Sequence, residues 1–194
     1  MKKSINTFLK HPTKDNTNKS ANPPVVRAST ILFNSMQEMH QHEIKVKQHK
    51  KVSHYTYGRY GSTTTIELEN ILKELEQAYH VFLTGTGFGG IALALMSLCR
   101  PGDEILVSDN VYGPTKEISE KLLKEFNINA KFYNSESFED LKNRVTKKTK
   151  MILVENPGSI TFEFQDLSKI VSLAKKKKIY TLLDNTWGTP LYLK

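Results

Sequence analysis

Cysteine is almost absent from this sequence of 194 residues, because Cys99 is the only one. A single cysteine excludes an internal disulfide framework, and with it the small disulfide-stabilised folds of secreted proteins. Cys99 lies in an apolar run with helical character, so we expect a buried thiol. The shortage of cysteine also makes the cytoplasm the default location.

Long hydrophobic runs are missing as well. No stretch approaches the roughly 18 consecutive apolar residues of a membrane span. Residues 4–16, which follow the basic start, contain no apolar core of signal-peptide length. We therefore expect neither a membrane partner nor a secretory leader. With 38% hydrophobic and 25% charged residues, the chain has the composition of a globular protein and the length for one α/β domain.

Acidic residues are fewer than basic ones, 20 against 28, and the net charge is +8. Much of the excess is in lysine clusters at residues 45–51, 147–150 and 175–178. These clusters fall at predicted helix ends or in connections, where lysine is solvated or complements the helix dipole. No nucleic-acid-binding motif accompanies them, so we expect no nucleic-acid partner.

The hydrophobic pattern predicts a polar, irregular N-terminal arm over residues 1–54 and an α/β domain over residues 55–194. Leu68, Leu72, Leu75 and Tyr79 recur at helical spacing and predict a first helix. Alternating strands and helices then predict a mostly parallel sheet with helices on both faces, whose ligands gather at the carboxyl ends of the strands. The expected strands are at residues 81–83, 104–108, 130–133, 151–155 and 179–184, and the following helices at 91–98, 114–126, 138–145 and 167–178, with 81–83 and 91–98 buried.

A glycine-rich loop, G-T-G-F-G-G at residues 85–90, lies between the first predicted strand and a helix. Asp109, which ends the next strand, completes the context of a dinucleotide-binding fingerprint. However, glycines and a helix N-terminus accommodate any phosphate group. A Rossmann-type module that binds NAD, another phosphate site and a tight turn without ligand all remain open. The helix and arm that precede the loop are unusual for a Rossmann domain.

Four further features are where a phosphorylated aromatic cofactor would need them. Asp184 could pair with a protonated pyridine nitrogen or simply cap a turn. Tyr112 could stack on a ring or be an ordinary loop tyrosine. Tyr57 and Arg59 could clamp a phosphate or form a packed surface pair. Residues 155–159 follow a buried strand and form either a ligand-facing loop or a turn.

Together these segments resemble the cystathionine β-lyase branch of the Cys/Met-metabolism enzymes that depend on pyridoxal 5'-phosphate (PLP). Residues 22–30, N-P-P-V-V-R-A-S-T, are similar to the N-terminal arm of that family. Residues 57–62 resemble its Y-G-R-x-G phosphate motif, and residues 184–187 match its D-N-T-W. Residues 155–161, E-N-P-G-S-I-T, are close to its E-S-P-G-S-I-T signature, with Asn156 in place of serine. The resemblance runs from residue 22 to the end and is far more specific than the glycine loop.

The resemblance implies a fold of the PLP-dependent transferase type (fold type I) and PLP as cofactor. The backbone N–H groups of Gly87 and Phe88 would hold the phosphate, Tyr112 would stack on the pyridine ring, and Asp184 would bind its nitrogen. The sequence departs from the family at residues 88–90, where small residues, often methionine and alanines, are expected in place of F-G-G.

The resemblance also implies a homo-oligomer, a dimer or tetramer, because Tyr57 and Arg59 would reach the cofactor phosphate of a neighbouring subunit. The complete enzyme would be a lyase that cleaves the C–S bond of cystathionine to give homocysteine, pyruvate and ammonia.

The lysine that forms a Schiff base with PLP in this family stands in a Ser/Thr-x-Thr-Lys segment. No lysine of this sequence does, Lys194 included. We therefore expect no catalytic residue and no metal ligand here, and a truncated or split chain with little activity alone. It would be a remnant of a degraded gene, or one half of an enzyme completed by a second, C-terminal chain that binds the substrate carboxylate.

Overall fold

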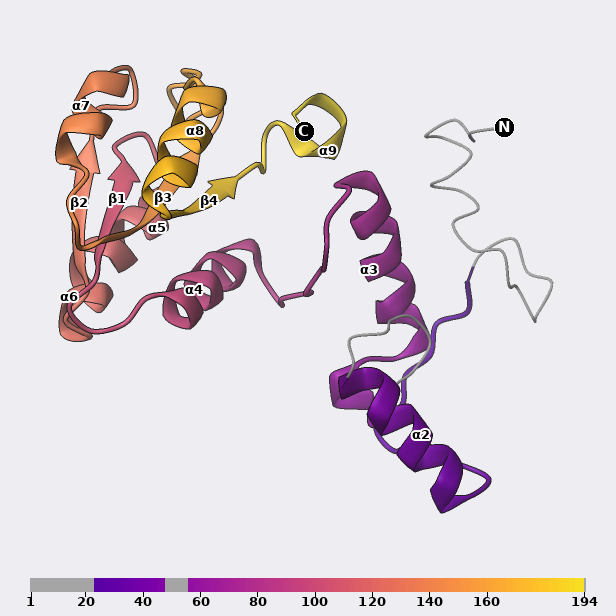
Figure 1. The fold of residues 1–194 in the computed structure, drawn as a ribbon. Coiled ribbons are helices and arrows are strands. Elements are labelled where there is room, and N and C mark those ends of the chain that lie inside the picture. The colour runs from indigo at the N-terminus through magenta and orange to yellow at the C-terminus, as the bar shows by residue number, and fades with distance from the viewer. Residues whose placement is uncertain (1–22, 48–55, 194) are drawn as a thin grey trace. The chain divides into compact units, whose positions relative to one another are not determined.

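The computed structural model describes residues 23–47 and 56–193. The chain divides into two compact units, Met1–Leu83 and Thr84–Lys194, which are described separately below. The predicted boundary after residue 54 falls outside the described residues and stays a prediction. The first unit contains α2 (Met36–Lys47), η1 (Gly58–Tyr60) and α3 (Thr63–Leu75). The second contains α4 (Gly87–Leu98), β1 (Glu104–Ser108), α5 (Gly113–Glu117), η2 (Ile118–Leu122), α6 (Leu123–Glu125), β2 (Asn129–Tyr133), α7 (Phe138–Arg144), β3 (Thr149–Glu155), α8 (Leu167–Lys177), β4 (Tyr180–Asp184) and α9 (Thr189–Tyr192) (Figure 1).

In the first unit, the predicted arm packs against the segment that precedes α3. Thr30 forms an antiparallel bridge with Tyr57, and the Gly58 N–H donates to Ser29 O at 2.7 Å. A Cβ atom on Gly58 would lie 1.7 Å from the carbonyl oxygen of Ala28, so only glycine permits this approach. The arm and the Y-G-R segment therefore form one local structure.

Helix α3 is shorter than the spacing of its apolar residues predicts. It begins with a capping box in which Ser62 and Thr65 satisfy each other's backbone N–H groups. It ends at Leu75, and Gln77 adopts the left-handed conformation with φ 51°. Tyr79 therefore lies beyond the helix and is exposed, and its assignment to the apolar stripe was wrong.

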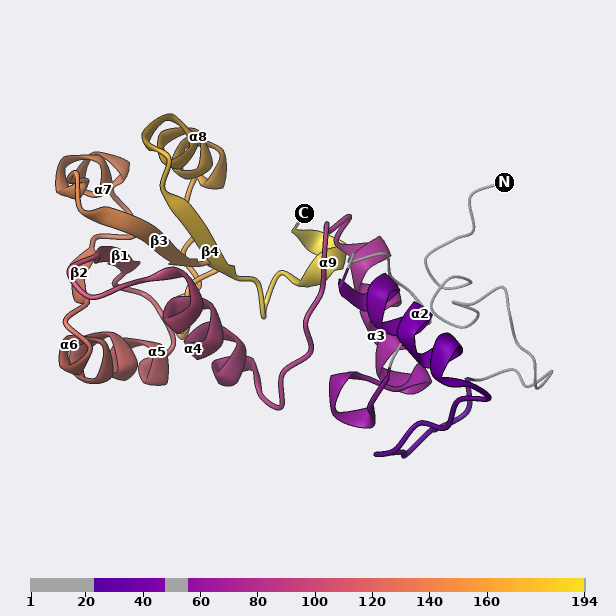
Figure 2. The same ribbon diagram turned by 60° about the horizontal axis from the view of Figure 1, so that its bottom comes forward.

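The second unit confirms the predicted parallel sheet, with strand order β2-β1-β3-β4 and every pair parallel. All five residues of β1 are buried, as expected for a strand covered on both faces. Figure 2 shows α4, α5 and α6 on one side of the sheet and α7 and α8 on the other. Alternate residues of β1 accordingly enter two different cores, Ile105 and Val107 in one and Leu106 in the other.

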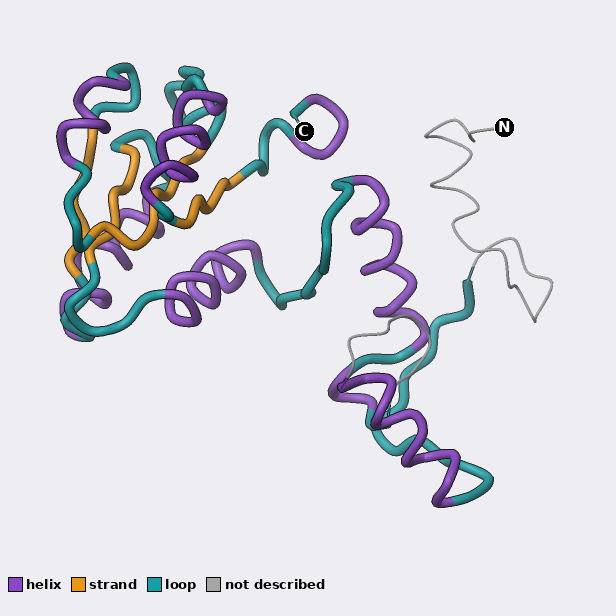
Figure 3. Tube along the Cα trace, in the orientation of Figure 1, coloured by secondary structure: helices purple, strands orange, loops and turns teal. Residues whose placement is uncertain are grey.

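The strand expected at residues 81–83 is absent from the described chain. Phe82 is 74% exposed, and the whole segment between α3 and α4 is loop (Figure 3). A strand needs a neighbour that accepts and donates its backbone hydrogen bonds. Among the described residues, 81–83 take part in no strand pairing.

Helix α4 was predicted as a buried helix, but it is amphipathic. Its buried side chains are Ile91 and Leu95, whereas Leu93 is 52% exposed. Cys99, the residue after the helix, is buried as predicted, and burial raises the pKa of its thiol. An apolar composition alone did not distinguish a helix buried all round from one with an uncovered apolar face.

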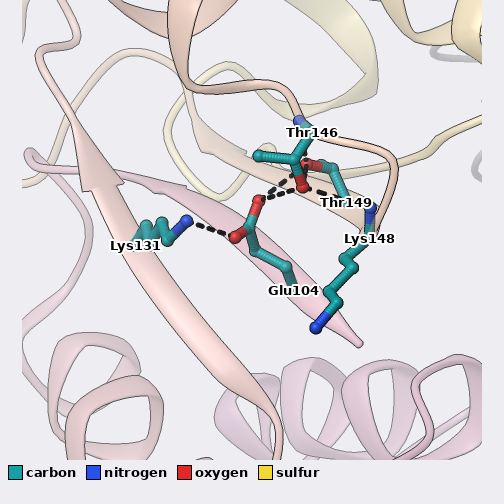
Figure 4. Close-up of polar contacts among 5 residues, drawn as sticks. All are labelled: Glu104, Lys131, Thr146, Lys148 and Thr149. Atoms are coloured by element: carbon teal, nitrogen blue, oxygen red, sulfur yellow. Dashed lines mark hydrogen bonds and ion pairs between the residues drawn. The ribbon is translucent and has the colours of Figure 1, made fainter. Parts of the chain in front are cut away.

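A polar cluster around the buried side chain of Glu104 connects β1 with both of its neighbouring strands (Figure 4). Glu104 at the start of β1 forms an ion pair with Lys131 of β2. Its Oε1 accepts from Thr149 Oγ1 at 2.8 Å and from Thr146 Oγ1 at 3.0 Å. Burial alone would raise the pKa of Glu104, but the hydrogen bonds from these three residues outweigh it and hold the pKa below its usual value.

Among residues 23–47 and 56–193, no helix is long and apolar enough to cross a membrane.

Candidate functional site

Several of the predicted site residues follow the carboxyl ends of the strands. Tyr112 comes shortly after β1, and Asp184 is the last residue of β4. Since the strands are parallel, these ends lie along one edge of the sheet. Helix α4 packs on the sheet and leads into β1, and its amino end points to the same side as the carboxyl end of β4 in Figures 1 and 2. The amino end of α4 thus faces the side of the second unit on which β4 ends.

The glycine loop forms the first turn of α4. Thr86 is the N-cap, and its Oγ1 accepts from the Gly89 N–H at 2.9 Å. Gly87 and Phe88 are the first two helical residues, whose N–H groups have no carbonyl partner within an α-helix. A Cβ atom on Gly87 would meet nothing within 4 Å, so the space beside this residue is open. The arrangement suits a bound anion, and the phosphate contact expected of both residues stays a prediction.

Tyr112 is held through its backbone. Its N–H donates to Oε2 of Glu155 at 2.6 Å, and its carbonyl accepts from the Lys116 N–H at 3.0 Å in the first turn of α5. The side chain is 47% exposed. The residue thus has a fixed backbone and a ring face open to a ligand.

Asp184 directs its carboxylate into a turn. Its Oδ1 accepts from the N–H of Thr186 at 3.0 Å and from Oγ1 of the same residue at 2.5 Å. Within the described residues these contacts engage Oδ1 alone, so Oδ2 can take another donor. The turn brings Trp187 edge-on against Phe162, with ring centroids 4.8 Å apart, and so connects the loops after β3 and β4.

The loop of residues 155–161 is fixed by hydrogen bonds to its neighbours. Asn156 Oδ1 accepts from the Gln165 N–H at 2.7 Å, and the Ser159 N–H donates to Asn110 O at 2.9 Å. A Cβ atom on Gly158 would lie 2.2 Å from Nδ2 of Asn110, so this position also requires glycine. Asn156, which replaces the family's serine, is buried and serves the loop itself.

Asp109 does not take the role that the dinucleotide fingerprint would give it. Its Oδ1 accepts from the Ser135 N–H at 2.9 Å, and its own N–H donates to Tyr133 O at 3.0 Å. The carboxylate therefore joins the connections that follow β1 and β2.

Tyr57 and Arg59 belong to the first unit, and the structure brings them together there. The guanidinium carbon of Arg59 lies 5.2 Å from the centroid of the Tyr57 ring, a cation–π distance. The Tyr57 hydroxyl accepts from Ser29 Oγ at 3.3 Å. A hydroxyl and a guanidinium are thus presented side by side, as a phosphate clamp requires.

Glu155, the last residue of β3, lies at this edge too. It is the first residue of the E-N-P-G-S-I-T segment, but we did not predict a role for its side chain. It is 4% exposed. Burial raises the pKa of its carboxyl group, the Tyr112 N–H opposes the rise, and the negative charge of Asp184 adds to it. The signal in the sequence is a carboxyl group at the end of a run of buried strand residues, where an acid is costly unless it has a partner.

The edge of the second unit fits PLP in three respects. Gly87 and Phe88 offer N–H groups to a phosphate, Tyr112 offers an aromatic face, and Asp184 offers a carboxylate oxygen to a protonated ring nitrogen. The most specific of these observations is the start of α4, where the N–H groups of Gly87 and Phe88 have no carbonyl partner within the helix.

Comparison with known proteins gives the same assignment. Residues 6–194 match the family model described as Cys/Met metabolism PLP-dependent enzyme. The chain is 34% identical to the cystathionine beta-lyase of Bordetella avium over 96% of its own length and 48% of the relative's. It is 31% identical to the L-alanine/L-glutamate racemase of Wolbachia pipientis over 90% of its length and 44% of the relative's. The crystal structure of cystathionine gamma-lyase from Lactobacillus plantarum with L-serine matches at a TM-score of 0.79 and 25% identity, covering 91% of this chain and 42% of that one.

The chain thus spans about half the length of the relatives it matches. The structural match confirms the predicted PLP-dependent, fold type I architecture. These relatives leave the alternative of a Rossmann-type NAD-binding module without support.

Proposed function

The chain belongs to the Cys/Met metabolism family of PLP-dependent enzymes, and on this basis we propose that it is the cofactor-binding part of a cystathionine β-lyase-like enzyme. The observation that supports the proposal is that three groups suited to PLP occur in the second unit, one at the amino end of α4 and two after the carboxyl ends of parallel strands. These are the open first turn of α4, the half-exposed ring of Tyr112 and the free carboxylate oxygen of Asp184. The E-N-P-G-S-I-T and D-N-T-W segments favour a lyase within the family.

PLP, when bound, supplies an electron sink to an amino-acid substrate. Asp184 would strengthen that sink, because a carboxylate beside the ring nitrogen favours its protonated form. The helix N-terminus at Gly87 and Phe88 would neutralise the phosphate, and Tyr112 would limit the tilt of the ring. Tyr57 and Arg59 would contact the phosphate of a neighbouring subunit's cofactor, so we propose a homodimer or homotetramer.

The proposed reaction of the complete enzyme is hydrolytic cleavage of cystathionine. The bond between Cβ and sulfur breaks, the thiol leaves as homocysteine, and water releases ammonia from the remaining three-carbon fragment as pyruvate forms. We expect the chain by itself to release little pyruvate, because none of its lysines stands in a Ser/Thr-x-Thr-Lys segment. A polypeptide segment that carries this lysine would complete the enzyme.

Cofactor titration tests the first part of the proposal. The purified chain is titrated with PLP, and binding is followed by the absorbance of the cofactor and the quenching of Trp187 fluorescence. We expect saturable binding at one PLP per chain. Saturable binding of NAD without binding of PLP would overturn the proposal.

The reaction is tested separately. Cystathionine is added to the PLP-loaded chain, with and without a second chain that carries the lysine segment, and pyruvate is measured. We expect pyruvate only with both chains. Rapid release by this chain alone would contradict the role given to the missing lysine. Interconversion of L- and D-alanine without pyruvate release would place the reaction with the racemases of the family.

A further inference from the structure

Glu155 is connected to both of the groups that we expect to contact the cofactor ring. Its Oε2 lies 2.6 Å from the Tyr112 nitrogen, and the two residues are 43 positions apart in the sequence. On the neighbouring strand, Asp184 is its direct partner in the register of β3 and β4. Asn156, the residue after Glu155, also contacts Asp184, because its N–H donates to Asp184 O at 3.3 Å.

The backbone of Glu155 is itself fixed by buried groups. Its N–H donates to Ser108 Oγ at 3.4 Å, and its carbonyl accepts from Gln165 Nε2 at 3.3 Å. Gln165 is fixed in turn, because its Oε1 accepts from the Tyr133 hydroxyl at 2.8 Å. Glu155 therefore holds the loop after β1 from a rigid position at the end of β3.

The Tyr112 N–H needs this acceptor. Tyr112 is the N-cap of α5, and its side chain makes no capping hydrogen bond. Without the carboxylate, its N–H would lose a short contact to a buried, charged acceptor, and the backbone could turn. Because the side chain is 47% exposed, a turn of the backbone would move the ring.

We infer that Glu155 is a positioning residue, whose carboxyl group sets the place of the Tyr112 ring relative to Asp184 and so the gap in which the cofactor ring is held. The inference rests on the proposed function for the identity of the ligand. It makes no use of Glu155 as a proton donor or acceptor. The contact to Tyr112 and the register with Asp184 carry it.

Two variants test the role. Glu155→Gln keeps an acceptor oxygen near the Tyr112 N–H, and Glu155→Ala removes it. We expect about tenfold weaker PLP binding for Glu155→Ala and a smaller loss for Glu155→Gln. We also expect the circular dichroism of bound PLP, which reports the asymmetric contact with the Tyr112 ring, to fall in the same order. Glu104→Gln is the matched control, since it changes a buried carboxyl group at the opposite edge of the sheet.

A double-mutant cycle separates positioning from general destabilisation. Glu155→Ala should weaken PLP binding much less in a Tyr112→Ala background than in the wild-type chain. Amide hydrogen exchange at Tyr112, measured without PLP, should be faster in Glu155→Ala than in Glu104→Gln, because only the first substitution removes the acceptor of the Tyr112 N–H.

The outcomes are distinguishable. If the wild-type chain fails to bind PLP, the proposed function falls, whereas the Tyr112 exchange rates still decide whether Glu155 fixes this loop. If PLP binds, additive effects of the two substitutions or an unchanged exchange rate at Tyr112 overturn the positioning role. If Glu155→Ala does not fold, Glu155→Gln carries the same comparison.

Discussion

Asp184 shows how one side chain at the end of a strand can serve both the fold and a ligand. Its Oδ1 closes the turn to Thr186, and this contact orients the carboxylate rigidly. A carboxylate that is already oriented pairs with a cationic ring nitrogen without losing side-chain entropy on binding.

We expect Asp184→Ala to weaken PLP binding by at least about tenfold, or about 1.4 kcal/mol, because the protonated ring nitrogen loses its counter-charge. Titration followed by cofactor absorbance measures the change. Asp166→Asn serves as the control, because asparagine caps the helix α8 as well as aspartate does. Equal affinities for Asp184→Ala and the wild-type chain would exclude contact with the ring nitrogen.

The pKa of Glu104 is lower in the folded chain than in the unfolded one. The stability of the fold should therefore depend on pH through this residue. Such a group stabilises the fold above its unfolded pKa, about 4.3, and this contribution is lost as the pH falls through the folded pKa. Glu104→Gln should therefore lower the free energy of unfolding by about 2 kcal/mol at pH 7, and the difference should shrink below about pH 4. Urea unfolding across this pH range measures it.

Glu117→Gln provides the comparison for Glu104. Glu117 forms an ion pair with Lys121, but both side chains are exposed and solvent screens the pair. We expect a much smaller effect on unfolding. A pH dependence as large as that of Glu104→Gln would show that the buried cluster has no special part in acid stability.

At the scale of elements, α4 combines a core face with an uncovered apolar face. Leu95 is fully buried against the sheet, and Leu93, two positions earlier, is exposed. Leu95→Ala should cost about 3 kcal/mol of stability, through lost burial and the cavity left behind. Leu93→Ala should cost less than about 0.5 kcal/mol in the same urea unfolding assay. Similar losses for the two variants would mean that this face of α4 is covered in solution.

The hydrophobic pattern predicts some of the strands correctly and one of them wrongly. Residues 105–107 and 151–154 are continuous apolar runs, and here such runs correctly predict buried parallel strands, whose two faces are both covered. Residues 81–83 have the same character, yet the described chain has no strand there. Strand formation depends on a hydrogen-bonding neighbour, and a local pattern contains no information about that neighbour.

At the scale of the whole molecule, the phosphate clamp of Tyr57 and Arg59 lies in one compact unit and the remaining cofactor groups in the other. If this clamp acts on a neighbouring subunit, PLP affinity should rise with protein concentration in the range where the chain associates. Arg59→Ala should weaken binding about tenfold and abolish this concentration dependence. Arg100→Ala is the control, because Arg100 donates to the backbone carbonyls of Ser97 and Cys99. An effect of Arg59→Ala that is independent of protein concentration would place the clamp within one subunit.

From residue 104 on, the sequence by itself determined the alternation of strands and helices, and it also determined the parallel sheet and the family. These depend on local periodicity and on short motifs such as D-N-T-W at residues 184–187, in which neighbouring residues act together. Only the tertiary structure decided that Glu155 holds Tyr112, that Asp109 serves the fold, that α4 is open on one face and that residues 81–83 form no strand. The physical reason is common to all four. Burial, hydrogen-bond partners and strand neighbours join residues that are far apart in the chain, and no spacing along the sequence records which of them meet.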